Sequence, residues 1–429
     1  MLVALLPTLS RAQTPTTTYA IQGAKIFTLA GPPIENGTVL IRDGKIAQVG
    51  RDVSVPAGAK IIDGKGLEIY PGMFDPVTQI GIDEVSAVAS TLDVAELGLY
   101  NPDLVAATAV NPTSAHIPVT RASGITEVLV VPGVVGFFGG GGSEVIGGQA
   151  SAINLAGWTN EEMIIRRSVA MAINWPVMQT QAFDLATFTL RERPFKEVKE
   201  EYDKKVNGLG DLLEQARHYS QAMQKGPSGA TERDLKLEAL VPVVEGKLPV
   251  LVVANDARGI KNAVEFCRKN HLKMILAGGQ EAYKVKDLLK QENIPVVLQP
   301  TERLPFHQDE PYDEADSEPS QLFAAGIKIA FASFNTSFSR RLPYYAGTAV
   351  GYGLPHEEAL KAVTRNTAEI FGLGDQLGTI EPGKMANLIV TTGDPFELNT
   401  ELKYLFINGQ QTSMENKHHE LYEEFRGRP

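Results

Sequence analysis

Residues 62–75 read Ile62-Asp63-Gly64-Lys65-Gly66-Leu67-Glu68-Ile69-Tyr70-Pro71-Gly72-Met73-Phe74-Asp75, and they join two parts of the chain with different patterns. From Tyr19 to Ile69, short apolar runs alternate with turn pairs such as Asn36-Gly37 and Asp43-Gly44. Such pairs between β-branched runs are strong hairpin signals, so we expect a small antiparallel β module. The same pattern returns near the C-terminus, at 387–390 and at 404–409. Two β-rich ends around a different middle predict one composite β-sandwich.

The middle of the chain alternates buried-type strands with amphipathic helices. Continuous apolar runs occupy residues 124–131, 249–254, 273–277, 295–298 and 328–331, and helical patterns cover 259–270 and 281–292. Such an alternation indicates a parallel sheet covered on both sides, either a barrel or a doubly wound fold. Residues 191–240 are rich in charge and are broken by Gly226-Pro227-Ser228-Gly229. We interpret this stretch as two solvated helices inserted on the scaffold.

Motifs on both sides of the middle region share one resemblance. The junction 62–75, the preceding segment Gly37–Ile46, the helix-like string Glu358–Gly372 and the following Gly378–Asn387 occur in the order and at the spacing of one family. Together they resemble the metal-dependent amidohydrolase superfamily, and most closely its imidazolonepropionase-like branch. The resemblance covers Tyr19 to about Gln410.

The resemblance implies an α/β fold, with a (β/α)8 TIM-like barrel whose pocket lies at the carboxyl ends of the strands. A small composite β-sandwich formed by both chain ends is expected beside it. The expected division is a signal remnant or disordered segment at 1–18, the sandwich at 19–70 and 376–412, and the barrel at 71–375. The barrel carries the helical insertion at about 191–240, and a charged tail follows at 413–429.

The family binds zinc or another divalent metal in the barrel, and the resemblance assigns five positions of this chain to that site. Two of them lie at i and i+2 on the first strand, where side chains on one side of a strand can grip one ion. The five positions are occupied by Val77, Gln79, Val253, Gly278 and Phe334. Valine and phenylalanine offer no lone pair, and a neutral glutamine amide is a poor substitute for imidazole on zinc.

A comparison of magnitudes argues against the family reaction. A metal lowers the pKa of bound water from about 15.7 to about 7, whereas a lone general base supplies only about 10²–10⁴-fold in rate. The seven histidines give an independent test, because no pair has H-x-H or H-E-x-x-H spacing. The single Cys267 excludes a Cys-based zinc site. We therefore expect no metal and no other cofactor.

Polar residues expected near the barrel mouth are the remaining pocket candidates, and they are Gln79, Asn255, Asp309, Tyr312, Asp313, Asn335 and Arg340. The loop from His307 to Glu318 follows the seventh strand and holds six carboxylates. It is either a hard-cation site, a collar for a basic ligand or a solvated acidic loop. Gly139–Gly142 lacks the Gly-Lys-Ser/Thr of a phosphate loop, so we interpret it as a mobile loop over the mouth.

Charge and the N-terminus restrict partners and location. Lys+Arg 40 against Asp+Glu 51 gives a net charge of −11, which argues against a general nucleic-acid binder. No apolar window long enough for a membrane span occurs after the N-terminus. Met1–Gln13 is a short apolar run with small residues before a cleavage position after Ala12, as in a secretory signal. We expect a periplasmic or secreted protein, with a cytoplasmic one as the alternative.

Two functions stay open. The first is a non-catalytic amidohydrolase-family protein, or pseudoenzyme, that has lost its metal site. It would bind a small-molecule ligand or act as partner subunit, in a homo- or hetero-oligomer, of an intact homologue. The alternative is an active hydrolase of carbon–nitrogen (non-peptide) bonds in small amides, with an atypical or absent metal. Gln79, Asn255, Asp309 and Asp313 are the groups to test for that activity.

Overall fold

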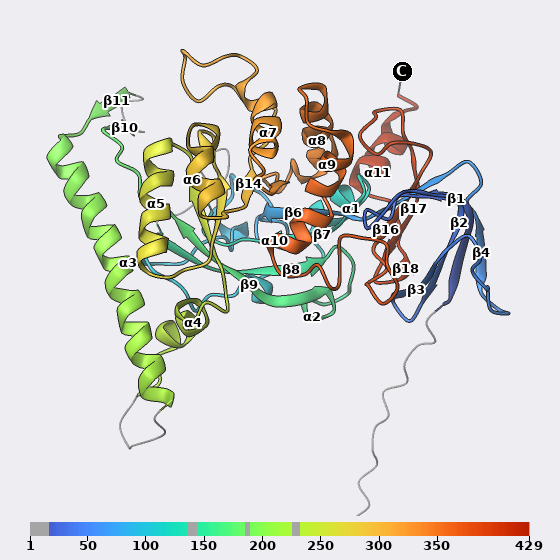
Figure 1. The fold of residues 1–429 in the computed structure, drawn as a ribbon, viewed down its shortest axis with the longest axis horizontal. Helices are drawn as coiled ribbons and strands as arrows, with labels where there is room; N and C mark the ends of the chain where they lie inside the picture. The colour runs from blue at the N-terminus through green and yellow to red at the C-terminus, as the bar shows by residue number, and fades with distance from the viewer. Residues whose placement is uncertain (1–16, 135–143, 185–188, 225–231, 429) are drawn as a thin grey trace, which may run out of the picture.

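The computed structural model describes residues 17–134, 144–184, 189–224 and 232–428. A barrel lies between a β-rich part, on the right in Figure 1, and the long helix α3 (Phe195–Gln224) on the left. This barrel, together with a sheet built from both chain ends, confirms the predicted fold class. The predicted cleavage position after Ala12 and the segment Gly139–Gly142 fall outside the described residues.

Both chain ends contribute strands to one eight-stranded sheet, in the order β18-β17-β16-β5-β1-β2-β3 with β4 paired to β1. The strands are β1 (Tyr19–Ile26), β2 (Ile34–Arg42), β3 (Lys45–Gly50), β4 (Lys60–Asp63), β5 (Glu68–Pro71), β16 (Leu388–Thr391), β17 (Leu402–Ile407) and β18 (Gln410–Gln411). The tight turns Asp43-Gly44 and Asn408-Gly409 have the positive φ angles that two-residue hairpins favour. These turns pack together, because a Cβ on Gly409 would lie 2.6 Å from Gly44 Cα.

The pair Asn36-Gly37 corrects one of the expected hairpins. It lies inside β2 and not between two strands. The register of β1 against β2 shifts on both sides of Ala24, which pairs with Gly37, and Asn36 has a φ of 52°. A Cβ on Gly37 would lie 2.5 Å from Ile26 Cδ1. The glycine therefore serves an irregular, closely packed stretch of strand.

The barrel is an eight-stranded sheet in the order β15-β14-β13-β12-β9-β8-β7-β6. Its strands are β6 (Met73–Thr78), β7 (Ile125–Val130), β8 (Ile146–Asn154), β9 (Ile164–Asn174), β12 (Val250–Ala254), β13 (Met274–Gly278), β14 (Val296–Leu298) and β15 (Ile329–Phe331). The first and last strands meet where the Phe334 amide donates to the Val77 carbonyl over 2.9 Å. Small and apolar side chains fill the interior, among them Ala150, Ala172 and Val297, so the barrel is a packed core.

One barrel strand runs against the others. β8 pairs antiparallel with both β7 and β9, whereas the other pairs in this sheet are parallel. Residues 155–163, between β8 and β9, hold only the short helix α2 (Asn160–Met163), and this is too short for a parallel crossover. The expected repeat of strand and helix is therefore interrupted. As a result the start of β8 lies beside the end of β9, where the Asn174 amide donates to the Val145 carbonyl over 2.9 Å.

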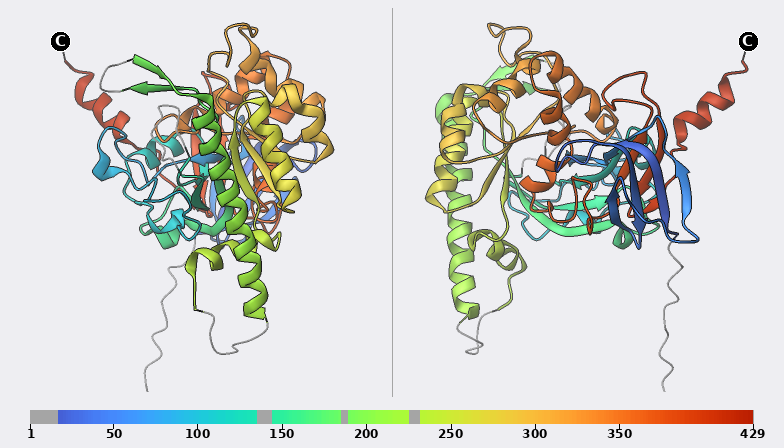
Figure 2. Two further views of the ribbon diagram at one scale, coloured as in Figure 1. Left: turned by 90° about the vertical axis from the view of Figure 1, so that its left-hand side faces the viewer. Right: turned by 45° about the vertical axis from the view of Figure 1, so that its right-hand side comes forward.

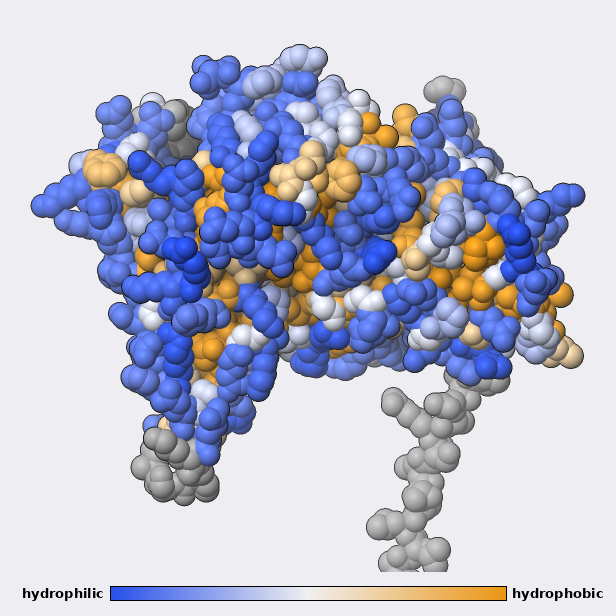
Figure 3. All heavy atoms as spheres, viewed as in Figure 1, coloured by the Kyte–Doolittle hydropathy of each residue, from blue (hydrophilic) through white to orange (hydrophobic). Residues whose placement is uncertain are grey.

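Helices cover the barrel on the side of β12 to β15 (Figure 1). They are α5 (Ala257–Lys269), η3 (Ala282–Val285), α6 (Lys286–Gln291), α7 (Glu314–Ala324), η4 (Ser339–Arg341), α8 (Leu342–Gly351), α9 (His356–Ala362) and α10 (Arg365–Ile370). In α5 the buried residues Ile260, Ala263, Val264 and Cys267 have the spacing of one helical face. The face drawn in Figure 3 is mostly hydrophilic, as expected for the outer surfaces of such helices.

The remaining elements lie around the barrel. They are η1 (Ala89–Thr91), η2 (Ala106–Thr108), α1 (His116–Arg121), the hairpin β10 (Gln181–Asp184) and β11 (Thr189–Glu192), α4 (Leu235–Val244) and α11 (Lys417–Phe425). Helices α3 and α4 occupy the charged stretch, and α11 projects from the body in Figure 2. Among the described residues, no helix combines the length and apolar character needed to cross a bilayer.

A buried polar network joins the barrel to the sheet of the chain ends. Asn387 Nδ2 donates to Glu127 Oε2 and to Asn154 Oδ1, each over 2.8 Å, and Asn387 Oδ1 accepts from the Asn408 amide over 2.7 Å. The Thr126 hydroxyl donates to the same Glu127 oxygen. Burial raises the pKa of Glu127 to about 8, against the opposing effect of these hydrogen bonds. Glu127 is therefore protonated and neutral at pH 7.

We expect the stability of the protein to depend on pH through Glu127. Folding raises the pKa of this group from 4.5 to about 8, so between these values the folded state holds a proton that the unfolded state releases. The contribution of Glu127 to the free energy of unfolding is fully present below the pKa of 4.5 that this group has in the unfolded state. It falls by roughly 1.4 kcal/mol per pH unit until the pH reaches the folded pKa. The E127Q substitution keeps the neutral shape and should remove this fall.

Denaturant unfolding at pH 6 and pH 8 measures the difference. Between these values the wild type should lose about 2 kcal/mol more stability than E127Q. E161Q is the matched control, because Glu161 is exposed on α2, and it should follow the wild type. An equal loss in wild type and E127Q would contradict the neutral state of Glu127.

Candidate functional site

Buried apolar side chains of the barrel core extend to the mouth of the barrel, where β12 to β15 end. Val77 lies on the first strand, β6, and Phe334 lies in the segment after the last strand, β15. They are 1% and 5% exposed and lie in the apolar core of the barrel. Phe334 has a φ of 51°, which is rare for a bulky residue. These two positions therefore contribute only carbon atoms to the end of the barrel.

The other three positions that the resemblance assigns to the metal are also packed. Gln79 is buried, and its Nε2 donates to the Val134 carbonyl over 3.0 Å. Val253 packs against the apolar core of the barrel. Gly278 has a φ of 91°, and a Cβ there would lie 2.3 Å from Asn255 Oδ1. A side chain at position 278 would therefore displace Asn255 and strain the backbone.

The fully buried Asp75 carboxylate lies on β6. It accepts hydrogen bonds from Ser333 Oγ over 2.5 Å, from Ser339 Oγ over 2.6 Å and from the Ser333 amide over 3.1 Å. Burial raises the pKa of Asp75 to about 6, although the hydrogen bonds of both serines act to lower it. Because Ser333 and Ser339 follow β15, this carboxylate fastens the last strand to the first. Its role is structural.

A row of amide side chains lies at the ends of β12, β13 and β14. Gln280 Nε2 donates to Gln299 Oε1 over 2.7 Å, and Gln299 Nε2 donates to Asn255 Oδ1 over 3.3 Å. Asn255 is among the residues predicted from the sequence, whereas Gln280 and Gln299 are not, although Gln299 directly follows β14 as a mouth residue should. Amides donate and accept hydrogen bonds but are weaker zinc ligands than imidazole, so this row suits a polar ligand.

The other predicted pocket residues lie on the segments after β14 and β15. Asp309 and Tyr312 are exposed, and Asp313 precedes α7 without capping it through its side chain. Asn335 Oδ1 accepts from the Phe338 amide over 3.0 Å, and Arg340 donates to a carbonyl in its own loop. In the described part of the chain, no hydrogen bond joins any of these side chains to Gln79 or Asn255.

Two carboxylates of the acidic loop are buried, which the sequence pattern did not indicate. Glu314 and Glu318 are 4% and 2% exposed, and Arg303 Nη2 donates to Glu318 Oε2 over 3.0 Å. Burial raises the pKa of Glu318 to about 8, against the effect of the Arg303 charge. This part of the predicted loop is therefore the packed first half of α7.

A group that can hold a metal ion lies beside this loop, and it corrects the expectation that no metal is bound. Glu281, His307 and Glu310 each offer one ligand atom, and these atoms all lie within 4.8 Å of one another. Glu281 follows β13, and the other two residues belong to the loop after β14. The ends of neighbouring strands thus assemble three ligands, two carboxylates and one imidazole, of types that zinc accepts. In the sequence His307 stands alone, because its partner Glu281 comes from another strand end.

Lys284 competes for the oxygens of this group. Its Nζ lies 2.6 Å from Glu281 Oε1 and 2.6 Å from Glu310 Oε1. Burial acts to raise the pKa of Glu310, but hydrogen bonds from Lys284, from the His307 amide and from Tyr283 outweigh it and lower the pKa to about 2. Both the ammonium and a divalent ion require the ionised carboxylates. The group therefore fits a metal by ligand type, and a bound metal must displace Lys284.

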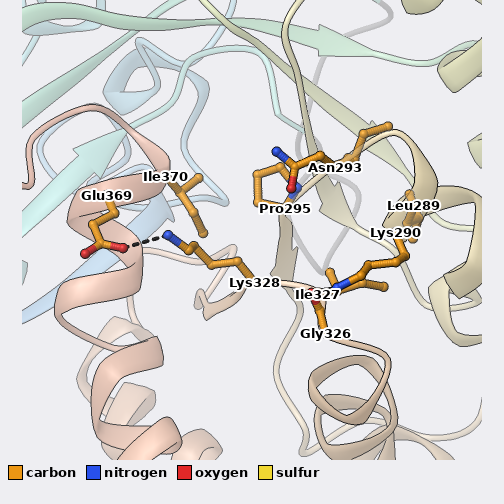
Figure 4. Close-up of a pocket in the computed structure, with 10 residues that line it drawn as sticks. Leu289, Lys290, Asn293, Pro295, Gly326, Ile327, Lys328, Glu369 and Ile370 are labelled. Atoms are coloured by element: carbon orange, nitrogen blue, oxygen red, sulfur yellow. Dashed lines mark hydrogen bonds and ion pairs between the residues drawn. The ribbon is translucent and has the colours of Figure 1, made fainter.

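A cavity of about 250 Å³ opens at the opposite end of the strands, beside the residues that precede β14 and β15. Figure 4 shows Lys328 directed at Glu369, with 2.6 Å between Nζ and Oε2. Lys290 Nζ donates to the Gly326 carbonyl over 2.9 Å. The charged groups of this cavity are already paired, so it offers no candidate chemistry.

Comparison with known proteins finds similar amidohydrolases. Residues 314–412 match the family model described as "Amidohydrolase family". The amidohydrolase tasK of Hapsidospora irregularis is 23% identical over 400 residues, which are 87% of this chain and 39% of that protein. The imidazolonepropionase of Thermoplasma volcanium is 26% identical over 405 residues, which are 88% of this chain and 90% of that protein. The chain thus spans well under half of the first relative and most of the second.

Among solved structures, the amidohydrolase from Thermotoga maritima MSB8 superposes with a TM-score of 0.77 and 26% identity, covering 92% of this chain and 99% of that chain. Molinate hydrolase, with a TM-score of 0.57 and 16% identity over 94% of this chain and 96% of its own, shares the fold alone. The chain is thus similar to amidohydrolases and to imidazolonepropionase, as its motifs predicted, and the family model covers its residues 314–412.

We expect the group of Glu281, His307 and Glu310 to bind Zn²⁺, and K284M to bind it at least about tenfold more tightly, because the competing ammonium is removed. H307A should weaken binding by at least the roughly 10–100-fold that loss of an outer-shell partner costs. Calorimetric titration of the full chain measures both effects. H218A is the matched control, because His218 on α3 also lies 3.3 Å from a glutamate. Equal affinity in H307A and the wild type would refute the assignment.

Proposed function

We propose that this chain, whose family match and fold support membership of the amidohydrolase family, binds a small polar ligand near the barrel mouth without hydrolysing it on the barrel axis. The observation that carries the proposal is the apolar closure by Val77 and Phe334. Metal-dependent hydrolysis needs ligand atoms and an activated water molecule. Two buried carbon side chains provide no ligand and leave no access for water at these positions.

The environment of Gly278 supports the same proposal. A histidine at this position would collide with Asn255, which the amide row holds in place. Recovery of a ligand there would thus require more than one substitution. The position of Asn255 and the backbone at Gly278 suit a residue without a side chain. Position 278 therefore differs from a metal site in which a single ligand has been replaced.

The amide row supports a binding role. Gln280, Gln299 and Asn255 present neutral donors and acceptors at the ends of three adjacent strands. Neutral amides can orient a polar ligand, but they supply no base of the strength that water activation needs. The same binding role is open to the chain as a subunit of an oligomer with an active homologue.

A second candidate function is hydrolysis of carbon–nitrogen bonds in small amides at the Glu281, His307 and Glu310 group. The clustering of these residues at the ends of neighbouring strands favours it. A divalent metal bound there would supply a Lewis acid and a water of lowered pKa. The ion pairs of Lys284 with both carboxylates count against this candidate.

An assay for amide hydrolysis distinguishes the two candidate functions, binding without hydrolysis and metal-dependent hydrolysis. We expect the purified full chain, supplied with Zn²⁺ or Mn²⁺, to release no ammonia or amine from small linear and cyclic amides above the rate of the metal alone. The reason is the lack of a metal-activated water on the axis. A metal-dependent amidohydrolase assayed in parallel is the positive control.

Metal-dependent turnover by the wild type would overturn the first candidate. If H307A then lost the activity while H218A kept it, the second candidate would take its place. Turnover that survives in H307A would refute both assignments.

A further inference from the structure

A cavity of about 280 Å³ lies beside the mouth, between the end of β9 and helix α3, and is called the α3 cavity below. Glu144, Asn174 and Trp175 line it from the barrel side, because the reversed strand β8 starts where β9 ends. Arg193, which follows β11, lines it together with residues of α3 that include Glu201 and Lys205. Its volume is just below the roughly 300–1,000 Å³ of most ligand pockets, so the ligand must be small.

Three polar atoms on the barrel side of this cavity have no hydrogen-bond partner within the described residues. They are Glu144 Oε2, Asn174 Oδ1 and Trp175 Nε1. Glu144 is 6% exposed and Trp175 is 4% exposed, so bulk water does not replace the missing partners. A buried polar group without a partner costs about 1–3 kcal/mol, and a charged one costs more. Three such atoms in residues that line one cavity point to a small ligand, which meets them once the side chains turn toward the cavity, because the atoms themselves are closed to solvent.

The hydrogen bonds of Asn174 define what the ligand must offer. Asn174 Nδ2 donates to the Gly133 carbonyl over 2.6 Å and to the Glu144 carbonyl over 3.1 Å. Both amide protons are therefore used, and Oδ1 remains as an acceptor. The Glu144 carboxylate also accepts, and it has no ion-pair partner among the lysines, arginines and histidines of the described chain. This wall requires N–H donors and a positive charge, and a primary ammonium group supplies both.

The α3 side of the cavity carries the opposite charge. Glu201 lies between two cations, with 2.7 Å to Arg193 Nη2 and 2.9 Å to Lys205 Nζ. Hydrogen bonds from Lys205 and Arg193 lower the pKa of Glu201 to about 2. One carboxylate neutralises only one of the two cations, so this side has a net positive charge. It favours an anionic group such as a ligand carboxylate.

We propose that the α3 cavity binds a small zwitterion, of which an amino acid is the simplest example. The ammonium group is held by Glu144 and Asn174, and the carboxylate is directed at Arg193 and Lys205. Trp175 Nε1–H donates to an acceptor on the ligand. The inference goes beyond the proposed function, because the α3 cavity is lined by other residues than the amide row of Gln280, Gln299 and Asn255.

Trp175 gives a direct readout. The chain has two tryptophans, and Trp158 is 91% exposed, so W158F leaves Trp175 as the single tryptophan fluorophore. The full-length W158F protein is titrated with ω-amino acids from glycine to 6-aminohexanoate, which place the two charges at increasing separation. n-Butylamine and butyrate carry one charge each. We expect at least one amino acid to change the fluorescence saturably and to bind at least about tenfold more tightly than either single-charge compound.

Variants on the two sides of the cavity test the assigned charges. E144Q in the W158F protein should bind the preferred amino acid at least about tenfold more weakly and should lose the preference for it over butyrate. K205M should weaken binding of the amino acid and leave the affinity for n-butylamine unchanged. E161Q, at an exposed glutamate, is the matched control and should leave every affinity unchanged. A general loss of structure does not produce this dependence on ligand charge, so K205M keeps the test decisive if E144Q fails to fold.

The absence of a saturable response across the whole series would overturn the inference, and so would an E144Q protein that binds as the W158F parent does. Both results leave the hydrolysis assay unaffected, and that assay tests the proposed function by itself. Metal-dependent turnover would overturn the proposed function whether or not an amino acid binds.

Discussion

The Asp75 carboxylate connects the first and last strands of the barrel, and the geometry of the mouth depends on this connection. β6 and β15 stand at the two ends of the hydrogen-bonded order of the sheet, so a continuous ladder does not join them. Ser333 and Ser339 instead donate to Asp75 from the segment after β15. Phe334 lies in that same segment. The interaction that closes the barrel therefore also positions Phe334, which is packed in the apolar core at this end of the barrel.

Buried acids of this chain differ in how their polar atoms are satisfied. Asp75 and Glu127 are fully buried, have a raised pKa and receive several hydrogen bonds within the barrel or at its joint with the terminal sheet. Glu144 is almost as buried but keeps one carboxylate oxygen without a partner in the described chain. Glu314 and Glu318 also keep one such oxygen each, but they lie on α7, beside the charge of Arg303. Glu144 differs from them because it lines the α3 cavity.

The architecture follows from local sequence patterns, whereas the metal-capable group and the α3 cavity do not, for physical reasons. The strands β7 and β12 to β15 are continuous apolar runs, as buried parallel strands should be, and the tight turns Asp43-Gly44 and Asn408-Gly409 occur as expected. β8 and β9 were missed because Gly147-Gly148 and Arg166-Arg167 interrupt their apolar pattern. The metal-capable group and the α3 cavity combine residues from separate strand ends. No spacing along the chain indicates such a combination, whereas positions such as Asn255 could be found because they directly follow a recognisable strand.

The reversed strand β8 changes how this chain must be aligned with other barrels. It begins beside the α3 cavity, just after Glu144, and it ends with Asn154 at the joint with the terminal sheet. In a regular barrel, the residues after a strand face the mouth and those before it face the base. For β8 this rule is inverted. Residues that correspond to another barrel by their order along the chain therefore do not correspond to it in space at this strand. A comparison of relatives that considers only the residues after each strand would miss Glu144.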